Sequence, residues 1–194
     1  SAEGWIKRLD EIHSRNSLTS LTRSAWYCSG CPHNSSTKAP DGSIVSAGIG
    51  CHTMAMWMDR GVVMGTHMGA EGAQWIGMQP FTDTKHIFQN MGDGTYAHSG
   101  SLAVRYCAAT NTNITFKILV NSHTSMTGGQ EIMGAEPVRA MVAELIANGV
   151  KRVIVTTEDL SRYNAVNLSG NTEVWHRDRL IEAQKVRAEI EGTT

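Results

Sequence analysis

The sequence lacks the features that mark several classes of protein. No run of 18 or more apolar residues occurs in its 194 residues, so no segment is expected to cross a membrane. The 17 Lys and Arg residues nearly balance the 18 Asp and Glu residues, which gives no electrostatic reason to expect nucleic acid as a partner. The polar N-terminus, SAEGWIKRLDEIHSRN, does not resemble a signal peptide. We therefore expect a cytoplasmic location.

Proline and phenylalanine are scarce, with 4 and 3 residues, and we find no internal repeat and no low-complexity segment. Glycine is plentiful, with 19 residues, and 41% of the chain is hydrophobic. This length and composition suit one globular domain with a real core. We expect residues 1–25 to form an N-terminal helix and a connection, and residues 26–194 to form the domain itself.

Strand and helix patterns alternate along the chain. Strands are expected at 44–50, 62–64, 86–91, 114–120, 152–157 and 173–177. Helices are expected at 3–14, 51–60, 99–111, 136–147 and 178–190, with a further helix after residue 64 and an irregular loop at 28–43. This order predicts an α/β fold in which helices flank a largely parallel sheet.

The stretch Gly92-Asp93-Gly94 follows one of these strands, and Asn121 follows the next strand, with 26 residues (95–120) between Gly94 and Asn121. One helix joins the two strands, so both side chains are expected at the same edge of the sheet, where ligands of parallel sheets bind. Carboxylate and amide oxygens are ligands that Mg²⁺ accepts, and the two glycines permit close approach of a diphosphate. The plainer alternative is a glycine turn with a solvated aspartate and an asparagine that caps a helix or turn.

The pattern of GDG, a helix, a strand and then Asn resembles the diphosphate-binding motif of thiamine diphosphate enzymes. Five stretches together resemble the thiamine-binding domain of 2-oxo acid:ferredoxin oxidoreductases, in particular the indolepyruvate type in its fused-chain form. These stretches are GDGTYAHSG, NITFKILVN, TSMTGGQ, CSGCPHNSST and AGIGCH. The resemblance implies the thiamine diphosphate-binding fold, of which this chain would supply the diphosphate-binding half.

The resemblance also implies roles for individual residues. Asp93, the Asn121 side chain and the backbone carbonyl of His123 would hold Mg²⁺. Gly50 and Cys51 would lie near the thiazolium ring. The diphosphate side of the cofactor would be lined by Gly92, Gly94, Thr95, Thr127 and Gly128.

Three of the four cysteines form a group: Cys28 and Cys31 in a CxxC pair, and Cys51 further on. Two thiolates three residues apart are typical of a metal centre. Spacing alone leaves zinc open, with His33 or His52 as the fourth ligand, and also a disulfide.

The resemblance instead implies a four-iron, four-sulfur cluster on Cys28, Cys31 and Cys51, whose fourth ligand lies far downstream. Cys107 sits inside an expected helix and is predicted to be structural, so the fourth ligand is missing from this chain. We therefore expect the chain to be a piece of a longer polypeptide that is truncated at its C-terminus.

The resemblance implies oxidative decarboxylation of an aryl 2-oxo acid, such as indolepyruvate, to an acyl-CoA. The cofactors would be thiamine diphosphate, Mg²⁺ and the cluster, and the partners would be coenzyme A, ferredoxin and the remaining domains or subunits. A non-oxidative thiamine decarboxylase or ligase and a non-catalytic zinc module are the alternatives. No catalytic residue is assigned, the roles of Glu71, His98 and His123 stay open, and the isolated chain is expected to be inactive.

Overall fold

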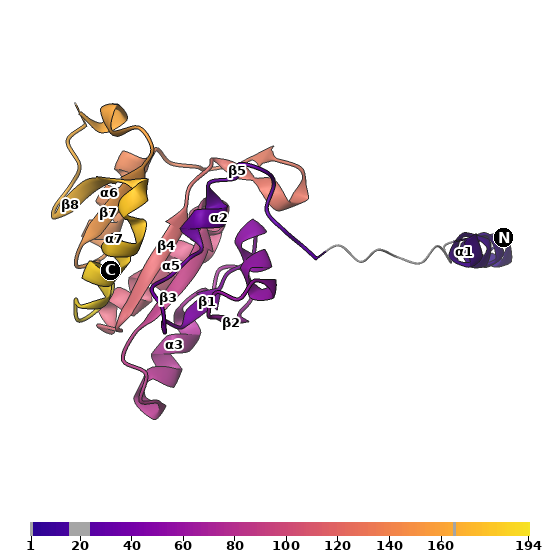
Figure 1. The fold of residues 1–194 in the computed structure, drawn as a ribbon, viewed down its shortest axis with the longest axis horizontal. Helices are drawn as coiled ribbons and strands as arrows, with labels where there is room; N and C mark the ends of the chain where they lie inside the picture. Colours follow the sequence, from indigo (N-terminus) through magenta and orange to yellow (C-terminus); the bar gives the residue numbers. More distant parts are fainter. Residues whose placement is uncertain (1, 16–23, 165) are drawn as a thin grey trace.

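The computed structural model describes residues 2–15, 24–164 and 166–194 (Figure 1). Its longer helices are α1 (Ala2–Arg15), α3 (Ala73–Met78), α5 (Ser101–Ala109), α6 (Val138–Ala147) and α7 (Leu180–Ala188), with short α2 (His33–Ser36) and α4 (Asp93–Thr95). The strands are β1 (Val45–Ala47), β2 (Val62–Gly65), β3 (Ile87–Gly92), β4 (Ile114–Leu119), β5 (His123–Thr124), β6 (Gln130–Glu131), β7 (Val153–Thr157) and β8 (Thr172–His176). No helix in these ranges combines the length and apolar character needed to cross a membrane.

A parallel four-stranded sheet, with strand order β2-β1-β3-β4, forms the centre of the molecule. Phe88 of β3 lies opposite Val45 on one side and Thr115 on the other. The strand is almost wholly buried, as expected for a parallel strand covered on both faces. The predicted α/β class with a largely parallel sheet is confirmed.

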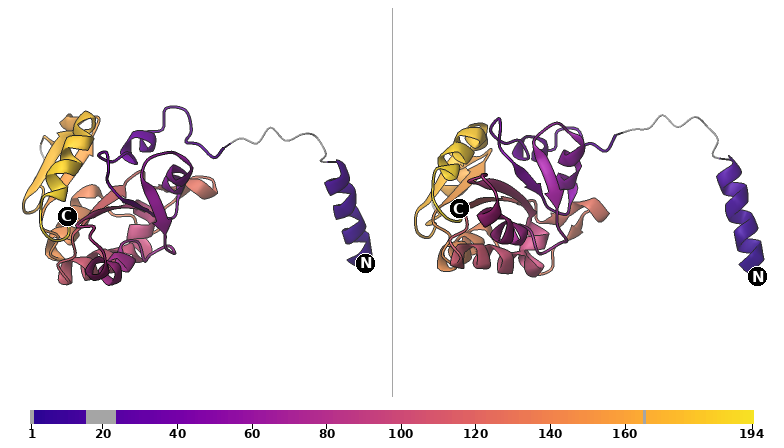
Figure 2. Two further views of the ribbon diagram at one scale, coloured as in Figure 1. Left: turned by 60° about the horizontal axis from the view of Figure 1, so that its bottom comes forward. Right: turned by 90° about the horizontal axis from the view of Figure 1, so that it is seen from below.

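Helices α3, α5 and α6 cover one face of this sheet, in the layer that lies below the sheet in Figure 2. Two apolar clusters hold this layer in place. One joins α5 and α6 to β3 and consists of Met91, Tyr96, Val104, Met141, Leu145 and Val150. The other joins α3 and α5 to the sheet and consists of Trp75, Ile87, Cys107 and Ile114.

Helix α7 and the segment around α2 lie on the opposite face. Lys117 of β4 is buried there, and its ammonium donates to the carbonyl of Lys38 at 2.9 Å and to Gln184 of α7 at 3.3 Å. Burial lowers the pKa of this lysine to about 7. Lys117 therefore joins the sheet to both covering segments.

The remaining strands lie outside the central sheet. Strands β7 and β8 pair in parallel, and β5 and β6 form a short antiparallel hairpin. The last residues of the chain also take part, because Thr193 forms a parallel bridge with Ile114 at the start of β4. This short extended segment lies where a neighbour of β4 belongs.

Several boundaries differ from the predictions. The helix expected at 99–111 begins at Asp93, because a short α-helical turn and a π-helical turn, Tyr96–Gly100, extend it backwards. The helix expected at 51–60 is a 3₁₀-helix, Cys51–Trp57, and the loop expected at 28–43 contains α2. Most of the connection expected at 14–24 lies outside the described residues. The domain boundary at residue 25 stays a prediction.

Candidate cofactor site

Asp93 ties together the carboxyl ends of β3 and β4. Its Oδ2 accepts hydrogen bonds from the backbone N–H of Asn121 at 2.8 Å and of Ser122 at 2.6 Å, and its Oδ1 accepts from Gly94 at 2.9 Å. The side chain is only 7% exposed. An ionised carboxylate has about four acceptor positions, so three backbone N–H groups leave room for one cation. The predicted juxtaposition of Asp93 with the Asn121 segment is therefore present at this edge.

Ser122 makes this arrangement possible through its backbone. It has φ of 62°, which is uncommon for a residue other than glycine, and this conformation accompanies the two successive N–H groups that point at Asp93. Such conformations persist only where the surrounding structure holds them, and they cluster at active sites and ligand-binding sites.

The side chain of Asn121 organises the loop that follows. Its Oδ1 accepts from the N–H of His123 at 2.9 Å, and its Nδ2 donates to Ser125 at 2.8 Å. A carboxylate, an amide oxygen with a second lone pair and the nearby His123 carbonyl form a set of hard oxygen donors, which is the chemistry Mg²⁺ requires. The donor chemistry of these residues therefore fits a magnesium site, and the metal assignment stays a prediction.

A buried histidine lies behind this edge. His52 is 4% exposed, and its Nε2 has no hydrogen-bond partner among the described residues. Burial lowers its pKa to about 4, with smaller contributions from His33 and Lys117, so the ring is neutral at physiological pH. The side-chain amide of Asn90, which lies in β3 next to Met91, is likewise buried and has no partner among the described residues. A Cβ on Gly92 would lie 3.5 Å from the His52 ring.

Glu71 has a clear structural place, although the sequence left it open. The residue is fully buried, and its carboxylate accepts from the backbone N–H of Gly69 at 2.6 Å and, at a longer 3.5 Å, from that of Ile49. It therefore joins the glycine-rich loop that follows β1 to the one that follows β2. By contrast, His98 and His123 are exposed, and among the described residues their rings bond to neighbours in sequence, Ser99 and Asn121.

The cysteine-bearing loop lies close to the same edge. The pKa of the Cys51 thiol is raised by burial and then by the neighbouring Cys31 and Cys28, so the three sulfur atoms are within electrostatic reach of one another. His33, two residues after Cys31, has its pKa lowered by burial and partly restored by Asp93. No group of three or more His, Cys, Asp or Glu side chains in the described ranges is arranged to hold one metal ion. The cluster assignment therefore stays a prediction.

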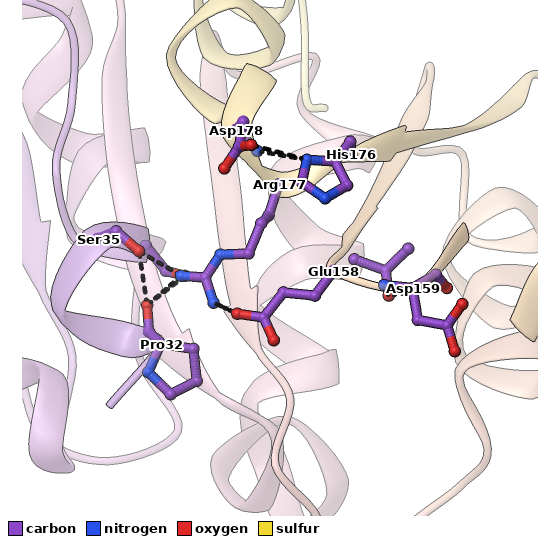
Figure 3. Close-up of polar contacts among 9 residues, drawn as sticks. Pro32, Ser35, Glu158, Asp159, His176, Arg177 and Asp178 are labelled. Carbon is purple, nitrogen blue, oxygen red and sulfur yellow. Dashed lines mark hydrogen bonds and ion pairs between the residues drawn. The ribbon is translucent and has the colours of Figure 1, made fainter. Parts of the chain in front are cut away.

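Arg177 fixes this loop to the second sheet (Figure 3). Its guanidinium donates to the carbonyl of Pro32 at 2.7 Å, to the hydroxyl of Ser35 and to the carboxylate of Glu158. The side chain reaches from the end of β8 across to α2, and Glu158 follows β7 directly. The position of the CxxC segment thus depends on an arginine about 145 residues away in sequence.

Comparison with known proteins identifies this arrangement. The family model of the thiamine pyrophosphate (TPP) enzymes, C-terminal TPP binding domain, matches residues 48–159, which is more than half of the chain. This chain belongs to that family. The TPP binding domain is also 27% identical over 141 residues to the indolepyruvate oxidoreductase subunit IorA of Thermococcus kodakarensis, an alignment that covers 63% of this chain and 22% of the relative.

A solved structure shares the fold of this TPP binding domain. It is the 2-oxoglutarate:ferredoxin oxidoreductase from Magnetococcus marinus, with 2-oxoglutarate, coenzyme A and succinyl-CoA bound. The TM-score is 0.60 at 21% identity, and the match covers 90% of this chain and 63% of that chain. The resemblance to 2-oxo acid:ferredoxin oxidoreductases of the indolepyruvate type, expected from the motifs, is confirmed. The chain spans about a fifth of the length of the curated relative.

The TPP binding domain brings most of the predicted site residues to one edge. Gly92 ends β3, Asp93, Gly94 and Thr95 begin the helical run, and a Cβ on Gly94 would lie 3.4 Å from Thr124 Oγ1 in β5. Thr127 and Gly128 lie on the exposed β5–β6 hairpin. Gly50 and Cys51 begin the 3₁₀-helix that carries His52.

Sequence reasoning missed three residues that shape this edge, Ser122, Asn90 and Arg177, and it considered His52 only as a possible zinc ligand. A serine with positive φ carries no sequence signal, and a buried histidine without a partner is visible only from packing. Asn90 is a polar residue inside a strand that is otherwise largely apolar, and this irregularity is the signal in the sequence that could have marked it as a candidate site residue.

Proposed function

We propose that this domain grips the diphosphate end of thiamine diphosphate, through Mg²⁺, within a 2-oxo acid:ferredoxin oxidoreductase. The observation that supports the proposal best is the Asp93 carboxylate, held by three backbone N–H groups with one acceptor position left over. Asp93, the Asn121 side chain and the His123 carbonyl would be the protein ligands of the metal.

The diphosphate would lie against the start of the helical run. The first N–H groups of a helix have no intrahelical acceptor and favour an anion, and this helix begins at Asp93 itself. Gly92, Gly94 and Thr95 would line the phosphates on this side, with Thr127 and Gly128 on the hairpin opposite. Gln130 holds that hairpin turn, because its side chain bonds to the hydroxyl and the carbonyl of Thr127 at 2.7 Å each.

Gly50, Cys51 and the buried His52 would lie toward the ring end of the cofactor. The neutral His52 ring and the Asn90 amide offer hydrogen-bonding atoms that have no partner among the described residues, which is costly unless a ligand or water satisfies them. Thiamine diphosphate, when bound, supplies the carbanion and the electron sink for decarboxylation of a 2-oxo acid. No residue of this chain is assigned to proton transfer.

We further propose that Cys28, Cys31 and Cys51 bind a four-iron, four-sulfur cluster that passes electrons to ferredoxin, and that the substrate is an aryl 2-oxo acid converted with coenzyme A to an acyl-CoA. The influence of the neighbouring Cys31 and Cys28, after that of burial, on the raised pKa of Cys51 supports the first part. The relative named for indolepyruvate supports the second.

The active site would be completed by further domains or subunits, and the isolated chain would be inactive. Apolar side chains near the ring end of the site are exposed, which is typical of a surface that meets a partner. They are Ile49, Met56, Trp57 and Met68.

Titration calorimetry with thiamine diphosphate tests the proposal. The chain should bind the cofactor in the presence of Mg²⁺ and lose about 100-fold in affinity when Mg²⁺ is removed or when Asp93→Asn is introduced. Asp83→Asn, a change at an exposed aspartate, is the matched control and should bind normally. Binding that is equally strong without Mg²⁺, or in Asp93→Asn, would contradict the proposed metal site.

A further inference from the structure

A cavity of about 690 Å³ separates β4 from β7. One wall is formed by the outer edge of β4 and the other by β7, so the cavity lies between the four-stranded sheet and the β7–β8 pair. Helix α6 closes one face and helix α7 closes the other. The residues that these two helices contribute are Val138, Met141, Val142, Leu145, Leu180, Ala183, Gln184 and Arg187.

Thr193 and Thr194 enter this cavity from one end as the beginning of a strand. The N–H of Phe116 donates to the carbonyl of Thr194 at 2.8 Å, and the N–H of Thr194 donates to the carbonyl of Ile114 at 3.0 Å. On the other side, the N–H of Lys151, just before β7, donates to the carbonyl of Thr193 at 2.9 Å. The segment is therefore bonded on both sides, as a central strand is.

Further along β4 and β7, no strand of the described chain occupies the space between them. The residues of a parallel strand alternate between its two neighbours. Ile114 and Phe116 bond to Thr194, so Ile118 is the next residue of β4 to face the cavity. Lys151 bonds to Thr193, so Val153 and Val155 are the next residues of β7.

The two covering helices differ in chemistry. Phe116 and Ile118 point toward the apolar α6 layer, whereas Thr115 bonds to the hydroxyl of Thr194 on the α7 side, where Lys117 meets Gln184. Arg187 of α7 is 4% exposed, and its Nε and Nη1 have no hydrogen-bond partner among the described residues. A buried guanidinium with unpaired N–H groups calls for an acceptor inside the cavity.

We propose that this cavity is the seat of one further β-strand, an extended peptide segment that continues from Thr194 and runs parallel to β4 and β7. The first and third residues beyond Thr194 face α6 and are apolar. The second faces α7, like Thr194, and carries an oxygen acceptor for Arg187. With this strand in place, the four-stranded sheet and the β7–β8 pair become one continuous parallel sheet.

The direction of the strand also determines which part of the molecule the residues after it reach. The far end of the cavity is lined by Pro32, His33, Asn121, Ser122 and Arg177. A strand in this seat therefore delivers the residues that follow it to the cysteine-bearing loop and to the loop that contacts Asp93.

Designed extensions of the 194-residue chain test the proposal. One chain carries Val-Glu-Val-Thr-Val after Thr194. A matched control has proline in place of the valines at the first and third positions of this extension, because proline cannot donate a ladder hydrogen bond. Amide hydrogen exchange is followed by NMR. We expect exchange at Ile118, Val153 and Val155 to slow by about 100-fold or more in the first chain and to stay unchanged in the proline control.

A third extension, with leucine in place of the glutamate, tests the role of Arg187 and should raise the melting temperature less than the glutamate version does. Two results would overturn the proposal. One is unchanged exchange in the first extended chain. The other is slow exchange at Ile118 and Val155 in the unextended chain, which would mean that β4 and β7 close on each other or, if sedimentation shows a dimer, that a second copy fills the cavity.

Discussion

Replacement of Asp93 by alanine should destabilise the fold itself, apart from any effect on a cofactor. The carboxylate accepts two N–H groups from the segment after β4, and hydrogen bonds to a charged group contribute ~1.5–3 kcal/mol each. Because Asn121 and Ser122 are exposed and water replaces part of this loss, we expect a decrease of about 2–4 kcal/mol in the free energy of unfolding. That is a large share of the ~5–15 kcal/mol typical of a domain.

Urea denaturation, followed by tryptophan fluorescence, measures this quantity. Asp93→Asn keeps one acceptor oxygen and should lose about half as much stability as Asp93→Ala. Asp83→Ala, at an exposed position, should stay within ~0.5 kcal/mol of the parent chain. If Asp93→Ala unfolded at the same urea concentration as the parent, the carboxylate would not join β3 to β4, and the reasoning above would be wrong.

Two further predictions concern buried groups. Burial lowers the pKa of Lys117 to about 7, from ~10.4 in the unfolded chain, so the folded state binds fewer protons between these two values. The free energy of unfolding, measured in urea, should therefore fall as the pH is lowered from 10 to 7, and Lys117→Met should flatten this dependence. The same pH dependence in the parent chain and in Lys117→Met would refute this prediction. Burial raises the pKa of Cys107 to about 12, so a thiol reagent at pH 8 should modify the exposed Cys28 well before Cys107; equal rates would contradict the structural role of Cys107.

The sequence was informative where a local pattern and a topological rule agreed. The strand before Gly92, the strand before Asn121 and the single helix between them require a right-handed crossover, which puts both polar residues at one edge. The bonds from Asn121 and Ser122 to Asp93 follow from that arrangement. The apolar context of Cys107 likewise predicted its burial, which the structure confirms.

The sequence was uninformative where contacts between distant segments decide the outcome. Glu71 is a charged residue among glycines, and only the convergence of two loops on its carboxylate buries it. Thr193 and Thr194 follow a glycine and carry no strand pattern of their own, yet pairing with Ile114 extends them. Arg177 ends an expected strand, and nothing in the sequence links it to Pro32 and Ser35, its partners in the fold.

The π-helical turn at Tyr96–Gly100 sets two rotations at once. An α-helix advances ~100° per residue, so the one extra residue in this turn changes the angle between the two ends of the helical run. At one end, Asp93 is directed at the loop after β4, and at the other, Val104 and Cys107 face the core. Deletion of Ala97 would restore regular winding but would turn one end away from its partners, so the length of this turn is as constrained as the identity of Asp93.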